Sequence, residues 1–171
     1  MHLFFYASVM HTELNTILNF LKEIDLPFHL NAVTDDTFLP GIAIRHGELV
    51  IDAEKLQFPG DILHEAGHLA VVTPQERRHL NGNVGEAKEP QNAMGDEMMA
   101  IAWSYAAACA TDLSARVVFH PHGYKGQSDW FLEQFESGHY PGLPLLVWIG
   151  LCDYPKEGVG GYPEMKKWLR D

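Results

Sequence analysis

The apolar positions of the chain follow helical spacing in some segments and strand spacing in others. From Thr12 to Ile24, apolar side chains recur every three or four residues, which predicts an amphipathic helix that ends before Pro27. Residues 41–52 contain two short runs rich in β-branched residues on either side of His46-Gly47, which predicts a β-hairpin. We expect the helix and the hairpin to form part of the scaffold.

A more continuous apolar segment follows the hairpin. Between Ile62 and Val72 the only charged residue is Glu65, so a helix here is apolar around most of its circumference and should be buried. Asp61 is a suitable N-cap, and Thr73-Pro74 should end the helix because proline cannot continue it. The pattern therefore predicts a buried helix over residues 61–72.

The second half of the chain is predicted to be mainly helical. Residues 73–95 are polar and interrupted by glycine and proline, which predicts a long loop. Residues 96–110 are apolar almost all round and predict a second buried helix that begins with two carboxylates. Shorter helices are predicted at 128–136, 141–151 and 163–170. Helices around a small sheet make an α+β fold, and 171 residues most simply form a single domain, 1–171.

Composition narrows the possible partners and location. The formal charge of −11 argues against nucleic acid and anionic membrane surfaces, which select for basic patches. The apolar run 143–151 is far shorter than a membrane span, and the first ten residues lack the basic start of a signal peptide. Only two cysteines are present, Cys109 and Cys152, so we expect free thiols and a cytoplasmic location. The oligomeric state stays open.

The predicted helix 61–72 contains a His-Glu-x-x-His motif at His64, Glu65 and His68. Residues four apart share one face of a helix, so both imidazoles can approach one metal ion from the same side. Two neutral nitrogen ligands, a carboxylate base and an open position for water are what a zinc hydrolase requires. Without a metal, the three side chains would have to form a hydrogen-bonded network in the core.

The segment from Ile62 to Ala70, Ile-Leu-His-Glu-Ala-Gly-His-Leu-Ala, resembles the active-site helix of the zincin metallopeptidases. The order helix, hairpin, metal-binding helix is similar to small zincins of the ImmA/IrrE kind, over about residues 12–110. The resemblance implies a zincin-like fold with His64 and His68 as zinc ligands and Glu65 as general base on a zinc-activated water. In such folds an edge strand binds an extended peptide by β-augmentation, and by analogy residues 42–45 would be that strand here.

Catalytic zinc usually takes three protein ligands and a water. The metzincin pattern fails, because Val71 and Pro74 stand where it requires glycine and histidine. The gluzincin pattern asks for a glutamate on a later helix, and we predict Glu97, which lies in phase with the buried face of helix 96–110. Asp96 is the alternative, and either carboxylate could instead cap the helix or complement its dipole. The loop residues Glu86 and Glu89 are further alternatives.

Residues 119–130 combine histidines and aromatic residues with glycines. Within this segment His120, His122 and Tyr124 could bind metal or donate a hydrogen bond to a developing oxyanion. Further candidates outside it are Tyr105, His139 and Tyr140. We expect a zinc-dependent hydrolase, most simply a peptidase acting on a peptide or protein. The alternative is a non-catalytic metal-binding sensor or interaction module, which a fourth protein ligand such as His120 or His122 would favour.

Overall fold

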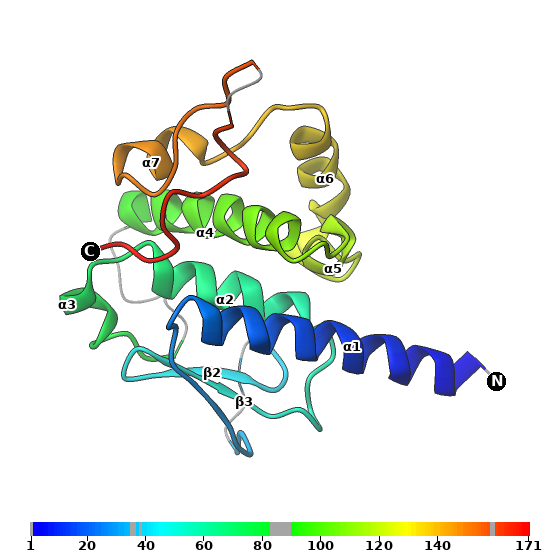
Figure 1. The fold of residues 1–171 in the computed structure, drawn as a ribbon. Helices are drawn as coiled ribbons and strands as arrows, with labels where there is room; N and C mark the ends of the chain where they lie inside the picture. Colours follow the sequence, from blue (N-terminus) through cyan, green and yellow to red (C-terminus); the bar gives the residue numbers. More distant parts are fainter. Residues whose placement is uncertain (1, 35–36, 38, 83–89, 158–159) are drawn as a thin grey trace.

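The computed structural model describes residues 2–34, 37, 39–82, 90–157 and 160–171. In these residues the chain forms seven α-helices, one 3₁₀ turn and a small mixed sheet of three strands (Figure 1). The predicted α+β class is therefore confirmed.

The first helix and the sheet occupy the N-terminal third. Helix α1 (His2–Glu23) is followed by strands β1 (Phe28–Leu30), β2 (Ile42–Arg45) and β3 (Glu48–Ile51). The strand order is β1-β3-β2, with β1 parallel and β2 antiparallel to β3. The predicted hairpin is confirmed, and its two turn residues both have positive φ, 51° at His46 and 79° at Gly47. Positive φ at both positions is what a tight two-residue hairpin turn requires.

The motif helix α2 spans Gly60–Ala70, close to its predicted range, but Asp61 does not cap it. The N-cap position belongs to Pro59, and Asp61 lies inside the first turn. Its carboxylate Oδ1 instead lies 2.9 Å from His120 Nε2. The Asp61 side chain, which the local pattern predicts to cap the helix, therefore contacts a residue that is distant in the sequence.

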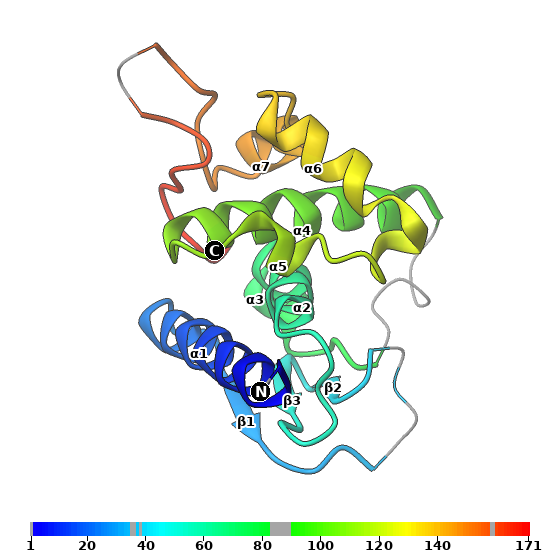
Figure 2. The ribbon, with the colours of Figure 1, turned by 90° about the vertical axis from the view of Figure 1, so that its right-hand side faces the viewer.

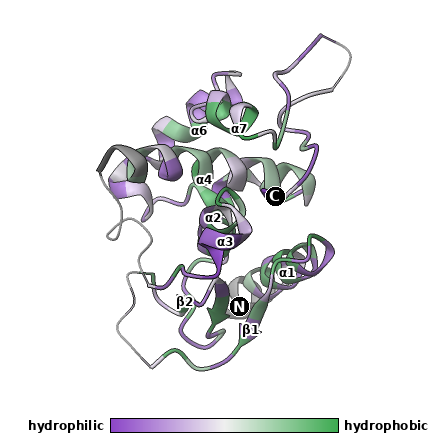
Figure 3. Ribbon diagram, turned by 90° about the vertical axis from the view of Figure 1, so that its left-hand side faces the viewer, coloured by the Kyte–Doolittle hydropathy of each residue, from purple (hydrophilic) through white to green (hydrophobic). Residues whose placement is uncertain are grey.

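The predicted loop 73–95 is shorter than expected because helix forms at both its ends. Helix α3 (Pro74–Arg77) begins with a capping box in which Thr73 and Glu76 bond each other's backbone N–H groups. Helix α4 (Pro90–Ala110) begins six residues before the predicted Asp96. Figure 3 shows that α3 is mostly hydrophilic, in keeping with its lack of buried residues.

Short elements complete the chain: α5 (Ala115–Val118), the 3₁₀ turn η1 (Tyr124–Gly126), α6 (Ser128–Glu136) and α7 (Leu143–Trp148). The predicted helix 128–136 is confirmed at both ends, and α7 is shorter than predicted. The predicted helix 163–170 is wrong. Its backbone bonds other segments instead, with Lys166 N donating to Leu151 O and Arg170 N to Ala70 O.

Helix α2 lies in the middle of the molecule. The sheet and α1 lie on one side of it, and α4 crosses on the other, with α6 and α7 beyond (Figures 1 and 2). Gly67 permits the close approach of α2 to α4, because a Cβ there would lie 2.8 Å from the carbonyl oxygen of Ala100. This contact brings the start of α4 close to the histidine face of α2.

Two further predictions can be compared with the described residues. Cys109 and Cys152 are both free thiols, as expected. Of the helices described, none is both long and apolar enough to cross a membrane.

Candidate metal centre

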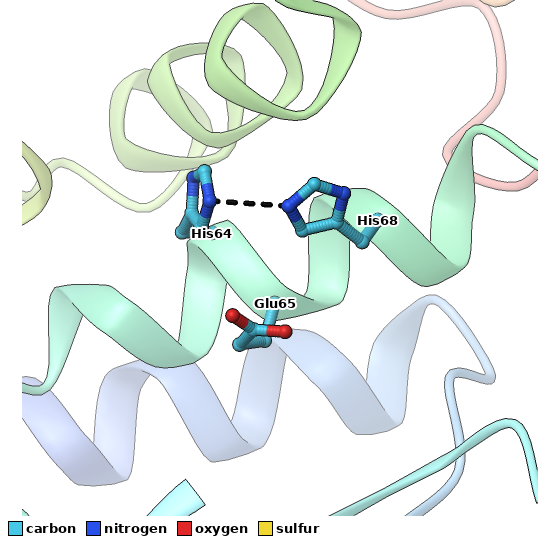
Figure 4. Close-up of side chains that lie close together, drawn as sticks. All are labelled: His64, Glu65 and His68. Carbon is cyan, nitrogen blue, oxygen red and sulfur yellow. Dashed lines mark hydrogen bonds between the residues drawn. The ribbon is translucent and has the colours of Figure 1, made fainter. Parts of the chain in front are cut away.

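The two motif histidines project from the same face of α2 toward α4 (Figure 4). Their Nε2 atoms lie 3.2 Å apart, and the two rings are perpendicular with centroids 4.8 Å apart. His68 is buried, and the side chain of His64 is 13% exposed. Donor atoms of His64, Glu65 and His68 all lie within 4.8 Å of one another, the one such cluster of possible metal ligands among the described residues.

Glu97 reaches the same point from the beginning of α4. Its Oε1 lies 3.5 Å from His64 Nε2, and its Oε2 lies 3.2 Å from His68 Nε2. The structure thus brings the predicted third ligand to the two histidines, although its role as a ligand stays a prediction. Its side chain is 45% exposed, so this side of the site faces solvent.

The spacing of these donors suits a small cation. Bonds of about 2.0–2.1 Å in a tetrahedral site hold neighbouring donors roughly 3.3–3.4 Å apart. The two Nε2 atoms lie 3.2 Å apart, and each faces a different oxygen of Glu97, with Oε1 at 3.5 Å from His64 Nε2 and Oε2 at 3.2 Å from His68 Nε2. Two imidazoles and a carboxylate are also ligand types that zinc accepts, leaving one tetrahedral position for water. The residues present therefore fit a zinc ion, while the identity of the metal is not shown.

The pKa values of the two histidines are shifted in opposite directions. Burial lowers the pKa of His64 to about 4. The neighbouring His68 also lowers this pKa, and the charge of Glu97 opposes both effects. Burial also disfavours the charged form of His68, but the hydrogen bond to Glu97 and the charge of Glu65 outweigh it and raise its pKa. His64 is therefore neutral at pH 7, the form in which an imidazole binds metal.

The two carboxylates differ as well. Burial raises the pKa of Glu65 to about 7, and the charges of Glu97 and Asp61 add to this effect, while His68 opposes it. Burial on its own would raise the pKa of Glu97, but the hydrogen bond to His68 and the nearby imidazoles hold this pKa below its ordinary value. A carboxylate whose pKa lies near 7 is suited to proton transfer, whereas an ionised one is suited to bind a cation.

Tyr124 is the member of the 119–130 candidates that reaches the site. Its hydroxyl oxygen lies 3.3 Å from His64 Nδ1, and the two rings are perpendicular at 5.4 Å. Burial raises the pKa of its hydroxyl, so Tyr124 is protonated at pH 7. The sequence pointed to this loop only through its histidines, aromatic residues and glycines.

His120 and His122 are not members of the cluster. His120 is buried, its Nε2 lies 2.9 Å from Asp61 Oδ1, and its ring stacks on Phe58 at 3.9 Å. His122 is exposed and lies against the same phenylalanine, with ring centroids 5.5 Å apart. Both histidines therefore contact residues outside the cluster, and neither is placed as a fourth ligand.

The remaining candidates fall elsewhere. Tyr105 stacks on Phe135 at 4.5 Å, Tyr140 packs edge-on against Tyr162 at 4.8 Å, and His139 accepts or donates a hydrogen bond with Ser137. The negative charge of Asp96 contributes to the raised pKa of His68, but Glu97 makes the direct contacts with both rings. Glu86 and Glu89 lie outside the described residues.

The strand predicted to hold a peptide, β2, is an outer strand of the sheet. Part of its outer edge is already paired, because Gly82 N donates to Ile44 O at 2.9 Å and Ile42 N donates to Leu39 O at 3.2 Å. Peptide binding at this edge stays a prediction.

No protein-family model matches the chain, and no match was found among curated proteins or solved structures. The likeness to zincins therefore depends on the motif and on the arrangement of the side chains around it.

Proposed function

We propose that this protein is a zinc-dependent hydrolase, most simply a peptidase, with His64, His68 and Glu97 as the zinc ligands. The observation that carries the proposal is the convergence of the Nε2 atoms of His64 and His68 with the carboxylate of Glu97, from two helices, at separations of 3.2–3.5 Å. The close approach of the two helices requires the absence of a side chain at Gly67, where a Cβ would lie 2.8 Å from Ala100 O. A neutral His64 and an ionised Glu97 are the protonation states that such a site needs.

Zinc bound there would supply a Lewis acid that polarises a carbonyl group and lowers the pKa of water. Glu65 has a donor atom within 4.8 Å of both imidazoles and a pKa of about 7. It accepts the proton of the attacking water and returns it to the leaving amine. The half-exposed Glu97 marks the side from which a substrate would enter. The choice of a peptide as substrate is supported by the resemblance to zincins.

Glu65→Gln tests the catalytic part of the proposal. Glutamine keeps the shape of the side chain but cannot accept the proton, so we expect zinc to stay bound and turnover of a peptide library to fall by at least about a hundredfold. The matched control is Glu133→Gln, which changes an exposed glutamate on α6.

Mass spectrometry of the digested library measures turnover, and elemental analysis measures zinc. Cleavage by Glu65→Gln at the wild-type rate would remove Glu65 from the mechanism. A wild-type protein that holds zinc but cleaves no peptide in the library would favour the non-catalytic metal-binding module.

A further inference from the structure

The loop between α5 and α6, residues 119–127, contacts the motif helix through two side chains. His120 Nε2 lies 2.9 Å from Asp61 Oδ1, and the Tyr124 hydroxyl oxygen lies 3.3 Å from His64 Nδ1. Asp61 and His64 are three residues apart on α2, so the two contacts lie one turn apart on one face of the helix. Among the described residues, these are the two side-chain hydrogen bonds between the loop and α2.

The contact between Asp61 and His120 is buried. The two residues are 7% and 6% exposed, and the His120 ring also stacks on Phe58 with centroids 3.9 Å apart. His120 Nδ1 has no hydrogen-bond partner among the described residues, so the ring makes its polar contact through Nε2. Breaking such a pair leaves a buried polar group without its partner, which is strongly unfavourable. The contact therefore favours a single placement of the loop on α2.

The backbone of the loop connects His120 to Tyr124. The carbonyl of His120 accepts from Gly123 N at 3.0 Å and from Ser128 Oγ at 2.6 Å. Tyr124 and Lys125 both have φ of 53°, a left-handed conformation that is unfavourable for residues other than glycine and persists only where the surroundings enforce it. We therefore expect a displacement of His120 to displace Tyr124 as well.

Aromatic packing also supports the ring of Tyr124. Its centroid lies 5.3 Å from that of Phe119 and 5.4 Å from that of Phe131. Aromatic pairs accept a range of centroid distances of about 4.5–7 Å, whereas a hydrogen bond weakens steeply as its angle departs from linear. The packing thus buries the ring, but the bond to His64 requires a closer definition of where the hydroxyl lies.

We propose that Asp61 and His120 are positioning residues for the metal centre. Their buried bond fixes the loop 119–127 on α2, and the loop in turn holds the Tyr124 hydroxyl against Nδ1 of His64. The inference rests on the metal site proposed above. A ligand bond through Nε2 leaves the proton of a neutral imidazole on Nδ1, and the Tyr124 oxygen faces that nitrogen. Outer partners that orient a metal-binding imidazole typically change metal affinity 10–100-fold when removed.

His120→Phe tests the inference at the loop. Phenylalanine keeps a ring that can stack on Phe58 but loses the bond to α2. We expect Tyr124 to leave its contact with His64, and Zn²⁺ to bind about tenfold more weakly. The matched control is His122→Phe in the same loop, because His122 is exposed and lies against the same phenylalanine with ring centroids 5.5 Å apart.

Two substitutions of Asp61 test the other partner. Asp61→Asn keeps an oxygen that accepts a hydrogen bond from His120 Nε2, so this variant should retain the placement of Tyr124 and most of the zinc affinity. Asp61→Leu removes the acceptor and should behave like His120→Phe. The double variant Asp61→Leu/His120→Phe replaces both polar groups with apolar ones, which keeps the test possible if the single variants do not fold.

The placement of Tyr124 is measured in the metal-free protein by the nuclear Overhauser effect between its ring protons and those of His64, since the two rings are perpendicular at 5.4 Å. Competition with a chelator of known affinity measures zinc binding, and thermal melting verifies that each variant is folded.

His120→Phe is also made in the Tyr124→Phe protein. If the Asp61–His120 pair acts through the Tyr124 hydroxyl, it should weaken zinc binding in the wild-type background and have no further effect in the Tyr124→Phe background. A general loss of structure would weaken zinc binding equally in both backgrounds.

An unchanged ring contact and unchanged zinc affinity in His120→Phe would overturn the inference. So would a loss of zinc affinity that is the same with and without the Tyr124 hydroxyl. Absence of zinc binding by the wild-type protein would instead overturn the proposed function, and the ring contact, measured without metal, still decides whether the Asp61–His120 pair places Tyr124.

Discussion

At the scale of single residues, the protonation of Glu65 links the site to the stability of the metal-free protein. Burial raises the pKa of this carboxyl from its ordinary value of 4.5 to about 7. Between these two pH values the folded chain holds a proton that the unfolded chain has released. The stability associated with this proton is full below pH 4.5 and is lost as the pH rises through 7.

Glu65→Gln should therefore stabilise the metal-free protein at high pH. The full pKa difference corresponds to roughly 3 kcal/mol, and because the side chain is partly exposed, we expect a gain of about 1–2 kcal/mol at about pH 8 and little change near pH 4. Denaturant unfolding of the metal-free wild type, Glu65→Gln and Glu133→Gln measures the free energies. A Glu65→Gln difference that is the same at both pH values would contradict the raised pKa.

At the scale of elements, the approach of α2 to α4 at Gly67 places the site residues of the two helices together. Gly67→Ala would put a Cβ 2.8 Å from Ala100 O and 3.0 Å from its Cα, backbone atoms that cannot turn away. We expect a loss of about 1–3 kcal/mol and weaker zinc binding, because Glu97 would move with α4.

Gly95→Ala is the matched control for this substitution. It lies on α4 itself, where the nearest atom to an added Cβ is Leu145 Cδ1 at 3.8 Å. Alanine favours helix over glycine, so this variant should be neutral or up to about 1 kcal/mol more stable. Chemical denaturation and zinc competition measure both properties, and equal effects of the two substitutions would show that the Gly67 contact does not set the distance between the helices.

The elements that the sequence predicts well are those whose signals are local. Helix α6 has the predicted bounds, Ser128–Glu136, and the hairpin turn lies at His46-Gly47 as its residue types require. Strand β1 was not predicted, because three residues are too few for a period and its pairing partner β3 lies twenty residues away. The terminal segment 163–170 has a helical pattern, but its backbone groups bond α2 and Leu151 instead.

In the candidate site, too, local sequence patterns predict some contacts and miss one that depends on a distant loop. The spacing of His64, Glu65 and His68 predicts their meeting on one helix face, and the phase of Glu97 on the buried face of α4 predicts its approach. The contact of Tyr124 with His64 depends on two consecutive left-handed residues in a loop. No periodic pattern encodes such a loop, so the sequence could name Tyr124 as a candidate but could not give its partner.

At the scale of the whole molecule, two arginines bind the end of the motif helix. Arg77 donates to Leu69 O at 2.6 Å and to Val72 O at 3.2 Å, while Arg170 donates to Ala70 O through its backbone and to Val71 O through its side chain. The last carbonyls of a helix lack partners within it, and those of Leu69 and Ala70, together with those of the two residues that follow α2, have partners from elsewhere. The C-terminal segment is in turn held by Trp168, which packs edge-on against Phe20 on α1 and Trp103 on α4.

Arg77→Met should lower the stability of the protein, because it leaves backbone carbonyls at the end of α2 without a donor. Methionine keeps most of the apolar stem of the side chain but has no guanidinium, so the loss of three charged hydrogen bonds, to Leu69 O, Val72 O and Arg170 O, should lower the free energy of unfolding by about 1–3 kcal/mol. Arg78→Met is the matched control, since the next residue is exposed and its guanidinium bonds Pro74 O on its own short helix. Urea denaturation compares the two, and equal losses would contradict a specific role for Arg77.

Zinc content is the central claim for the whole protein, because ligands from two buried helices would couple binding to folding. The most direct measurement is elemental analysis of the purified protein, after zinc is offered, beside a His64→Ala/His68→Ala double variant. We predict about one zinc per chain in the wild type, none in the variant, and a higher melting temperature of the wild type with zinc than with a chelator. A wild-type protein that takes up no metal under these conditions would contradict the account.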